Sequence, residues 1–320
     1  MKVLANDGIS QSGIDALESA GFEVSTTTVA QEQLANYINE NKISVVLVRS
    51  ATTVRKEVID ACPDLKIIGR GGVGMDNIDV DYAREQGLHV INTPAASSQS
   101  VAELVFAHLF TGVRYLYDSN RNMPLDGDTQ FKKLKKNYAK GVELRGKTLG
   151  IIGFGRIGQE VAKIGLGVGM KVIAADKFIE TADVSVDFFD GQSATFNIKT
   201  QTMDDVLKQS DFVTLHVPAQ KDYVIGQAQF DMMKEGSALI NAARGGVVNE
   251  VELVKALDSG KIAFAGLDTF QDEPTPAVQV LMNPKISLTP HIGAATNEAQ
   301  DRIGVELATQ IKNLLLVDNN

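Results

Sequence analysis

The chain has 320 residues, of which 44% are hydrophobic and 22% are charged, as in ordinary globular proteins. At roughly 100–200 residues per domain, this length predicts about two domains. The net charge of −9 argues against non-specific binding to nucleic acid or to an anionic membrane. The single cysteine, Cys62, excludes an internal disulfide and favours a reducing cytoplasm. The N-terminus reaches Asp7 too soon for a signal peptide, and no apolar run approaches the ~20 residues that span a bilayer.

The first part of the chain alternates short apolar runs with amphipathic segments. Strands are predicted over Val3–Ala5, Phe22–Ser25, Ile43–Val48, Leu65–Gly69 and Leu88–Asn92. Helices are predicted over Gly13–Ala20, Gln31–Asn39, Val54–Ala61 and Val80–Gln86. Because helices separate the strands, the pattern predicts a parallel, doubly wound sheet.

One long helix is predicted from about Ser98 to Tyr117, and the basic stretch Lys132–Lys140 follows it. A second alternating series begins at Lys147. Its predicted strands are Thr148–Ile152, Lys171–Ala175, Phe212–Val217, Ala238–Asn241, Ala263–Leu267 and Ile286–Thr289. The segment Asp183–Thr202 has no clear period and is expected to be a loop or a strand-rich excursion. An amphipathic helix, Glu298–Leu316, is expected at the end.

Two such series predict an α/β protein with two doubly wound parallel-sheet domains. We expect one domain over residues 1–97 plus 293–320, which recovers the C-terminal helix, and the other over residues 98–292. The cleft between two domains of this kind is a natural ligand site.

A glycine-rich turn opens the second series. Gly153, Gly155 and Gly158 form a G-x-G-x-x-G, with Arg156 and Ile157 inside it, between the strand Thr148–Ile152 and the next helix. In that context the pattern predicts a dinucleotide site: the first glycine permits a tight turn, the second lets the backbone approach a pyrophosphate, and the third lets the helix pack on the strand. The free N–H groups of the helix N-terminus would face the phosphates. The alternative is a structural glycine turn.

The following strand ends in Asp176. A carboxylate at this place accepts hydrogen bonds from the hydroxyls of the adenosine ribose and repels the 2′-phosphate of NADP, so we expect NAD as the cofactor. Lys177 follows directly and weakens the exclusion of NADP, and the alternative for Asp176 is a solvated acid at a strand end.

Polar residues also follow the later strands of the second series. Arg244 lies after Ala238–Asn241, Glu273 lies in the loop beyond Asp268, and His291 lies after Ile286–Thr289. Ligands bind outside the carboxyl ends of strands in such sheets. Oxidation of a hydroxyl needs a base near neutral pH, for which histidine is suited; a carboxylate orients it, and arginine binds a substrate carboxylate. Arg244, Glu273 and His291 are therefore the predicted catalytic residues.

The other three histidines have plainer interpretations. His89 lies at the start of a predicted strand and His108 lies within the long helix, so both are interpreted as structural. His216 lies near a strand end and is interpreted as a wall of the cofactor site rather than as a base. No metal site is predicted.

The sequence resembles the D-isomer-specific 2-hydroxyacid dehydrogenase family over nearly the whole chain. Four segments carry the resemblance: Gly69–Asp79, the G-x-G-x-x-G at Gly153, Asn241–Gly246, and Thr289–Gly293 with Glu273-Pro274 before it. The resemblance implies a flavodoxin-like substrate-binding domain and a Rossmann NAD-binding domain. It implies that Arg244 binds substrate, that His291 is the acid/base and that Glu273 pairs with it. The cofactor contacts that it implies fall on Val73, Arg156, Ile157, Asp176, Val217, Pro218, Ala242, Asp268, Gly293 and Ala294.

Within the family the chain resembles the phosphoglycerate dehydrogenases, through Val48–Thr52 and Arg70–Gly74. This implies oxidation of D-3-phosphoglycerate to 3-phosphohydroxypyruvate in serine biosynthesis, by a cytoplasmic homodimer in which the helix from Ser98 contributes to the interface. The implied substrate contacts are Arg49, Ser50, Arg70, Gly71, Val73, Arg244 and His291. The basic stretch, at Lys136 or a neighbour, either helps from a partner subunit or is a solvated loop.

Two departures from that group stand out. Many members carry a C-terminal regulatory domain, whereas this sequence stops after its last predicted helix, so feedback by serine through such a domain is not expected. Ser97 stands where asparagine is usual. Two other functions stay open: a reductase of glyoxylate, hydroxypyruvate or another 2-keto acid, and an NAD-sensing binding protein similar to the corepressors of this fold.

Overall fold

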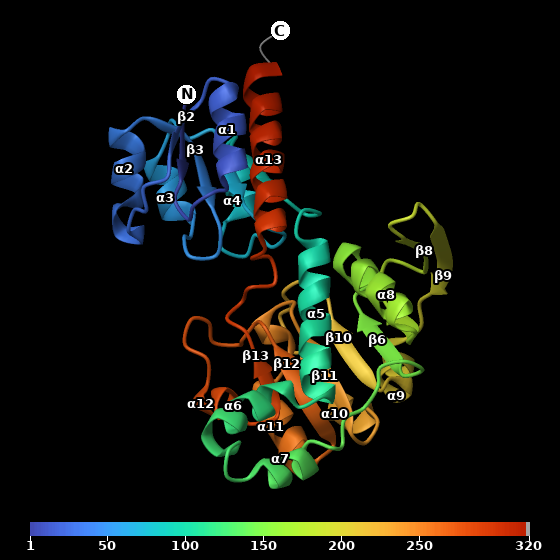
Figure 1. Cartoon of the computed structure of the whole chain (residues 1–320). Coiled ribbons are helices and arrows are strands. Elements are labelled where there is room, and N and C mark those ends of the chain that lie inside the picture. Colours follow the sequence, from blue (N-terminus) through green and yellow to red (C-terminus); the bar gives the residue numbers. More distant parts are fainter. Residues whose placement is uncertain (318–320) are drawn as a thin grey trace. The chain divides into compact units, whose positions relative to one another are not determined.

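The computed structural model describes residues 1–317, which divide into two compact units (Figure 1). The first unit contains Met1–Ser98 and the segment from Ala294 onward, and the second contains Gln99–Gly293. Each is an α/β fold around a parallel sheet, which confirms the predicted fold class. Within residues 1–317, no helix combines the length and the apolar character that a membrane span requires.

The sheet of the first unit has five parallel strands in the order β2-β1-β3-β4-β5. The strands are β1 (Lys2–Ala5), β2 (Glu23–Ser25), β3 (Ile43–Val48), β4 (Ile67–Arg70) and β5 (His89–Asn92). This is the flavodoxin-like order, in which the winding reverses between β1 and β3. Ligands bind at such a reversal, beyond the carboxyl ends of the strands.

Helices cover both faces of this sheet. One apolar cluster joins the sheet to α1 (Gln11–Ser19) and α13 (Asn297–Lys312), and the other joins it to α2 (Leu34–Glu40), α3 (Lys56–Ala61) and α4 (Val80–Glu85). Figure 1 shows α1 and α13 side by side. Gly13 and Gly304 make this approach close: a Cβ added at Gly13 would lie 2.7 Å from the Cα of Gly304. The C-terminal helix therefore completes the core of the first unit.

The second unit has a six-stranded parallel sheet in the order β13-β12-β11-β10-β6-β7. The strands are β6 (Thr148–Ile152), β7 (Lys171–Ala175), β10 (Phe212–Leu215), β11 (Ser237–Asn241), β12 (Ile262–Leu267) and β13 (Ile286–Leu288). The winding reverses between β6 and β10, as in Rossmann folds. The glycine turn after β6 lies at this reversal.

Two apolar clusters enclose the second sheet. One contains residues of α5 (Ser98–Val113) and α8 (Arg156–Val168), and the other contains residues of α9 (Met203–Gln209), α10 (Gln227–Met232), α11 (Glu250–Ser259) and α12 (Val278–Leu281). Further along from α5 lie α6 (Leu116–Asp126) and α7 (Phe131–Asn137). Short 3-10 turns occur at Gln31–Gln33 and Gly245–Val247, and Asn313–Val317 form a short π-helix.

The structure shortens the predicted helix from Ser98 and shows the form of the excursion. Other predicted ends shift by one or two residues, such as the strand Phe212–Val217, which ends at Leu215. The predicted helix Ser98–Tyr117 ends at Val113, because Tyr115 adopts a left-handed conformation with φ 54° and the chain restarts as α6.

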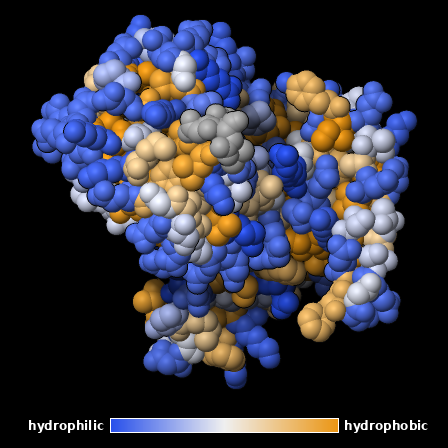
Figure 2. All heavy atoms as spheres, turned by 90° about the horizontal axis from the view of Figure 1, so that it is seen from above, coloured by the Kyte–Doolittle hydropathy of each residue, from blue (hydrophilic) through white to orange (hydrophobic). Residues whose placement is uncertain are grey.

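The excursion Asp183–Thr202 is strand-rich: β8 (Thr181–Asp187) and β9 (Ser193–Lys199) form an antiparallel hairpin. Its connection carries two exposed aromatic residues, Phe188 and Phe189. Figure 2 shows hydrophobic side chains scattered among polar ones on the face that it draws.

Candidate active site

The glycine turn has the geometry that a dinucleotide needs. Gly153 has φ 93°, and a Cβ there would lie 2.6 Å from the carbonyl carbon of His216, so only glycine fits. Gly155 precedes α8, no side chain caps that helix, and a Cβ at Gly155 would point into open space. Uncapped N–H groups beside open space suit a pyrophosphate. At Gly158 a Cβ would collide with the carbonyl oxygen of Gly153, which keeps the turn closed onto α8.

Asp176 follows β7 and ties the glycine turn to the next loop. One oxygen accepts from the N–H of Phe154 at 2.7 Å, and the other accepts from Phe178 at 2.8 Å and Ile179 at 3.0 Å. Burial alone would raise the pKa of Asp176, but these backbone hydrogen bonds outweigh it and lower the pKa. The carboxylate is therefore charged and held beside the turn.

The other predicted cofactor residues of the second unit also lie at carboxyl ends of strands. Val217 and Pro218 follow β10, Ala242 follows β11, Asp268 follows β12, and Gly293 lies beyond β13. Arg156 and Ile157 begin α8. Ala294 and Val73 belong to the first unit. Within residues 1–317, no group of three or more His, Cys, Asp or Glu side chains is arranged to hold a metal.

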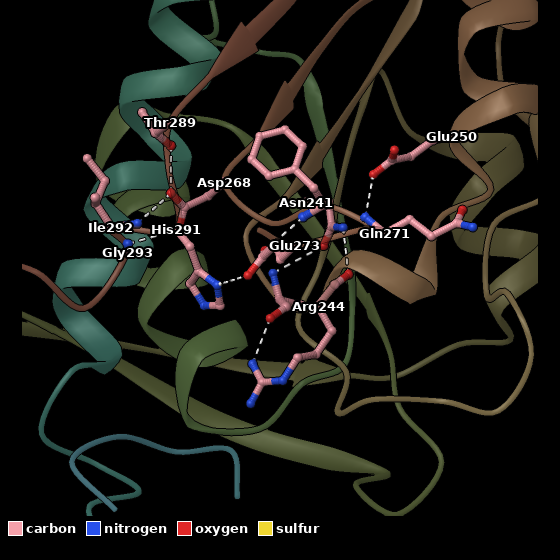
Figure 3. Close-up of polar contacts among 12 residues, drawn as sticks. Asn241, Arg244, Glu250, Asp268, Gln271, Glu273, Thr289, His291, Ile292 and Gly293 are labelled. Atoms are coloured by element: carbon pink, nitrogen blue, oxygen red, sulfur yellow. Dashed lines mark hydrogen bonds and ion pairs between the residues drawn. The ribbon is translucent and has the colours of Figure 1, made fainter. Parts of the chain in front are cut away.

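The three predicted catalytic residues come together at the ends of β11, β12 and β13. His291 Nδ1 lies 2.8 Å from Glu273 Oε2, and Figure 3 shows the two side chains pointing toward one another with Arg244 close by. Both members of the pair are about one-third exposed, 38% for His291 and 36% for Glu273. The pair is therefore open to a substrate while its geometry is fixed by the fold.

The charge of Glu273 is stabilised at this place. Burial would raise the pKa of Glu273, but the hydrogen bond with His291, a second one from the N–H of Phe270 at 2.9 Å and the charge of Arg244 lower it. Glu273 is thus a carboxylate at neutral pH and only accepts hydrogen bonds. The proton in the contact with His291 must then lie on Nδ1, which leaves Nε2 as the outward-facing nitrogen.

Backbone contacts hold the loops that carry Arg244 and Glu273. Asn241 donates its amide N–H to the carbonyl of Arg244 at 2.8 Å and accepts from the N–H of Ala243 at 3.1 Å. A Cβ at Gly245 would collide with the carbonyl oxygen of Phe270, so the two loops touch. Glu250, buried at the start of α11, accepts from the N–H of Gln271 at 2.7 Å (Figure 3).

The turn that carries His291 is fastened by Asp268. This residue is 1% exposed, and its carboxylate accepts from the Thr289 hydroxyl at 2.6 Å and from the N–H groups of Ile292 and Gly293, each at 2.8 Å (Figure 3). His291 has φ 54°, a conformation that costs an L-residue roughly 1–2 kcal/mol. The contacts on both sides of His291 hold it in this conformation.

In the first unit, the predicted substrate residues lie at the ends of β3 and β4. Asp7 accepts from the N–H groups of Arg49 at 2.6 Å and Thr52 at 3.1 Å. Asn77 donates to the carbonyls of Arg49 at 2.8 Å and Thr52 at 2.6 Å. The loop that carries Arg49 and Ser50 is therefore rigid. Arg70 ends β4, and Gly71 and Val73 follow it.

Comparison with known proteins identifies the family of the chain. Residues 106–293 match the model of the "D-isomer specific 2-hydroxyacid dehydrogenase, NAD binding domain", which covers more than half of the chain. The chain belongs to this family. Residues 106–293 accordingly form an NAD-binding domain, and the resemblance read from the sequence motifs is confirmed.

Relatives in the family differ in the substrate that their names state. A hydroxypyruvate reductase of Thermotoga maritima is 40% identical, with 97% of this chain and 97% of that protein covered. A D-3-phosphoglycerate dehydrogenase of Archaeoglobus fulgidus is 39% identical, with 98% of this chain covered, and the chain spans 57% of that protein's length. The structure of D-lactate dehydrogenase from Aquifex aeolicus, complexed with NAD and lactic acid, has a TM-score of 0.75 at 30% identity, covering 100% of this chain and 96% of that one.

The residues that hold the loops of the site in place were not predicted from the sequence. Asp7, Asn77, Asn241 and Glu250 act on loop backbones through hydrogen bonds. Glu250 meets Gln271 across 21 positions, and Asp7 meets Arg49 across 42. A local pattern carries no signal for such contacts. Asn241 lies in the segment Asn241–Gly246, which carries part of the family resemblance, but only Arg244 in that segment was given a role in catalysis.

Proposed function

We propose that this chain oxidises D-3-phosphoglycerate to 3-phosphohydroxypyruvate with NAD, as a step of serine synthesis. The observation that carries the chemistry is the 2.8 Å contact between His291 and Glu273 beside Arg244. In the same proposal, one domain, residues 1–97 plus 293–320, binds the substrate. The other domain, residues 98–292, binds NAD.

His291 is the general base in the oxidation direction. Because Glu273 fixes the proton on Nδ1, Nε2 has a free lone pair and accepts the proton of the substrate's 2-hydroxyl group. The imidazolium that forms donates from Nδ1 to the Glu273 carboxylate, which stabilises its charge. In the reverse direction the imidazolium returns the proton to the carbonyl oxygen.

Arg244 binds the carboxylate of the substrate and orients C2 toward the nicotinamide. NAD, when bound, supplies the acceptor for the hydride that leaves C2. The residues that we propose to hold it are Val73, Gly153, Gly155, Arg156, Ile157, Gly158, Asp176, Val217, Pro218, Ala242, Asp268, Gly293 and Ala294. The open space at Gly155 and the charged Asp176 support this assignment.

The phosphate end of the substrate is assigned to the first unit. Arg49 directly follows β3 and Arg70 ends the neighbouring strand β4, and a dianionic phosphate needs added positive charge. Ser50, Gly71 and Val73 complete the proposed substrate contacts. The rigid loop around Arg49 supports the proposal, because its guanidinium is presented without ordering of the loop on binding.

A second candidate is hydroxypyruvate reduction, because the Thermotoga reductase matches over 97% of its own length. The experiment follows the absorbance of NADH with 3-phosphohydroxypyruvate, hydroxypyruvate and glyoxylate. We expect the highest kcat/KM with the phosphorylated acid, and Arg49→Ala should lower that value about 10-fold or more while changing hydroxypyruvate turnover less than 3-fold. Equal or better use of hydroxypyruvate by the wild type would establish the second candidate, and no turnover by the folded protein would favour an NAD-sensing binding role.

The assembly that we propose is a homodimer in a reducing cytoplasm. The segment from α5 to α7 exposes large apolar side chains at Phe110, Leu116, Met123, Leu125 and Phe131. Exposed apolar side chains gathered on one segment are typical of a surface that a partner covers, which supports the dimer. The free, buried thiol of Cys62 supports the reducing compartment. Sedimentation of the purified protein as a monomer at micromolar concentration would contradict the dimer.

A further inference from the structure

A buried histidine lies beneath the turn that carries His291. His108 is on α5 and is 2% exposed. Its backbone is close to β12, because a Cβ added at Gly266 would lie 2.6 Å from the Cβ of His108. Gly266 precedes Asp268 by two positions, so the imidazole lies next to the carboxylate that fastens the turn.

Both nitrogens of His108 have hydrogen-bond partners on the chain around β13. Nδ1 lies 2.8 Å from the hydroxyl of Ser287, and Nε2 lies 3.0 Å from the hydroxyl of Thr289. Thr289 is in turn 2.6 Å from Asp268 Oδ1. A continuous chain of hydrogen bonds therefore runs from α5 to the turn.

The direction of each hydrogen bond follows from the chemistry of the groups. The Asp268 carboxylate accepts from the N–H groups of Ile292 and Gly293, and the single proton of the Thr289 hydroxyl completes this set. Thr289 must then accept from His108 Nε2–H. Nδ1 is left as an acceptor for the Ser287 hydroxyl. Burial lowers the pKa of His108, with a smaller opposing effect from Asp268, so the neutral form that this pattern requires is favoured.

We propose that His108 is a positioning residue for His291, acting through Thr289 and Asp268. The proposal rests on the proposed function, in which His291 is the base. Asp268 holds the turn on both sides of His291, at Thr289 and at Ile292–Gly293, and His291 has an unfavourable φ of 54°. Because His108 donates to the Thr289 hydroxyl, the proton of that hydroxyl can be donated only to Asp268. The turn is therefore held in a single conformation.

The test compares His108→Leu, which removes both hydrogen bonds, with His108→Gln, whose amide can donate to Thr289 and accept from Ser287. We expect His108→Leu to lower kcat about 10- to 100-fold, as for a displaced catalytic group, with less than a 3-fold change in substrate KM. His108→Gln should recover most of the kcat. Leu109→Ala, a buried neighbour on α5 outside the hydrogen-bond chain, is the matched control for lost stability and should keep the wild-type kcat.

A double-variant comparison tests the route. If His108 acts through Thr289, Thr289→Val should lower kcat to a similar extent, and adding His108→Leu to it should lower kcat less than a further 2-fold. Multiplied effects on kcat in the double variant would overturn the route. An unchanged kcat in His108→Leu, or equal losses in Leu109→Ala, would overturn the positioning role.

Amide exchange separates this inference from the proposed function. Deuterium uptake by a peptide spanning residues 289–293 should be faster in His108→Leu than in wild type and close to wild type in His108→Gln. This readout needs no turnover, so an inactive wild-type protein would defeat the proposed function and still leave the positioning of the turn to be decided. Equal uptake in wild type and His108→Leu would overturn the inference.

Discussion

His291 shows how single residues here are set by their surroundings. Glu273 fixes which nitrogen carries the proton, and Asp268 holds the turn on either side of the residue. The left-handed backbone at His291 costs roughly 1–2 kcal/mol. It is tolerated because the hydrogen bonds of the turn together stabilise this conformation by more than that cost. The site is thus preorganised before substrate arrives, which is how enzymes avoid reorganisation during the reaction.

We propose that the single residue Asp176 determines the choice of NAD over NADP. Burial alone would raise the pKa of its carboxyl group, but backbone hydrogen bonds lower it, so a charged carboxylate would repel the 2′-phosphate of NADP. We expect Asp176→Ser to lower kcat/KM with NAD by about 10- to 100-fold, since hydrogen bonds to a charged group contribute about 1.5–3 kcal/mol. The same variant should raise kcat/KM with NADP. Steady-state rates with both cofactors measure this, and comparable use of NAD and NADP by the wild type would refute the role of Asp176.

Much of the site was predictable at this scale because strand ends carry it. Arg244, Glu273, His291 and Asp176 were all identified from their places after apolar runs, and the structure puts the first three together. The supports were not predictable, since Glu250 and His108 act on residues distant in sequence. His108 was interpreted as structural, which its burial matches, but its hydrogen-bond chain to the turn gives no signal in the sequence.

Elements were predictable where apolar periodicity is strong and less so where the backbone conformation changes. The strands Ile43–Val48, Thr148–Ile152 and Lys171–Ala175 begin and end where predicted. The helix from Ser98 was predicted too long because nothing in the residue pattern marks the left-handed Tyr115. The β8–β9 hairpin does follow a strand pattern, because apolar and polar residues alternate along both strands and the apolar ones pair in register, as Val184 does with Phe196. This period of two was not recognised in the sequence.

The packing of α1 on α13 gives a prediction at the element scale. Gly304→Ala should destabilise the protein by about 1–3 kcal/mol, because the new methyl group meets Ser10 and the backbone of Gly13. Gly167→Ala on α8, where a Cβ meets nothing within 4 Å, is the matched control and should stabilise by about 0.4–1 kcal/mol. Urea unfolding measures both. A neutral Gly304→Ala would show that α13 does not pack this tightly.

At the scale of the whole molecule, buried histidines predict sensitivity to acid. Burial lowers the pKa of His216 to about 3, well below the value of about 6.5 in an unfolded chain. Between these values the unfolded state binds a proton that the folded state does not, so stability is full above about pH 6.5 and falls as the pH decreases. His108 has a lowered pKa for the same reason and acts in the same direction.

The free energy of unfolding should therefore fall between pH 6.5 and pH 5, and His216 contributes a slope of up to about 1.4 kcal/mol per pH unit. His216→Gln should reduce this slope by nearly that amount, measured by urea unfolding at a series of pH values. If the variant and the wild type lose stability in parallel, His216 does not account for the acid sensitivity.

In the proposed reaction, His291 moves the proton while Arg244 holds the substrate carboxylate. The most direct measurement is the turnover of purified His291→Ala with 3-phosphohydroxypyruvate and NADH, beside wild type and with circular dichroism to confirm folding. We expect kcat to fall about 10²- to 10⁴-fold, the range that general acid–base catalysis contributes, while NADH binding is retained. A folded His291→Ala protein with a wild-type rate would show that His291 is not the acid/base.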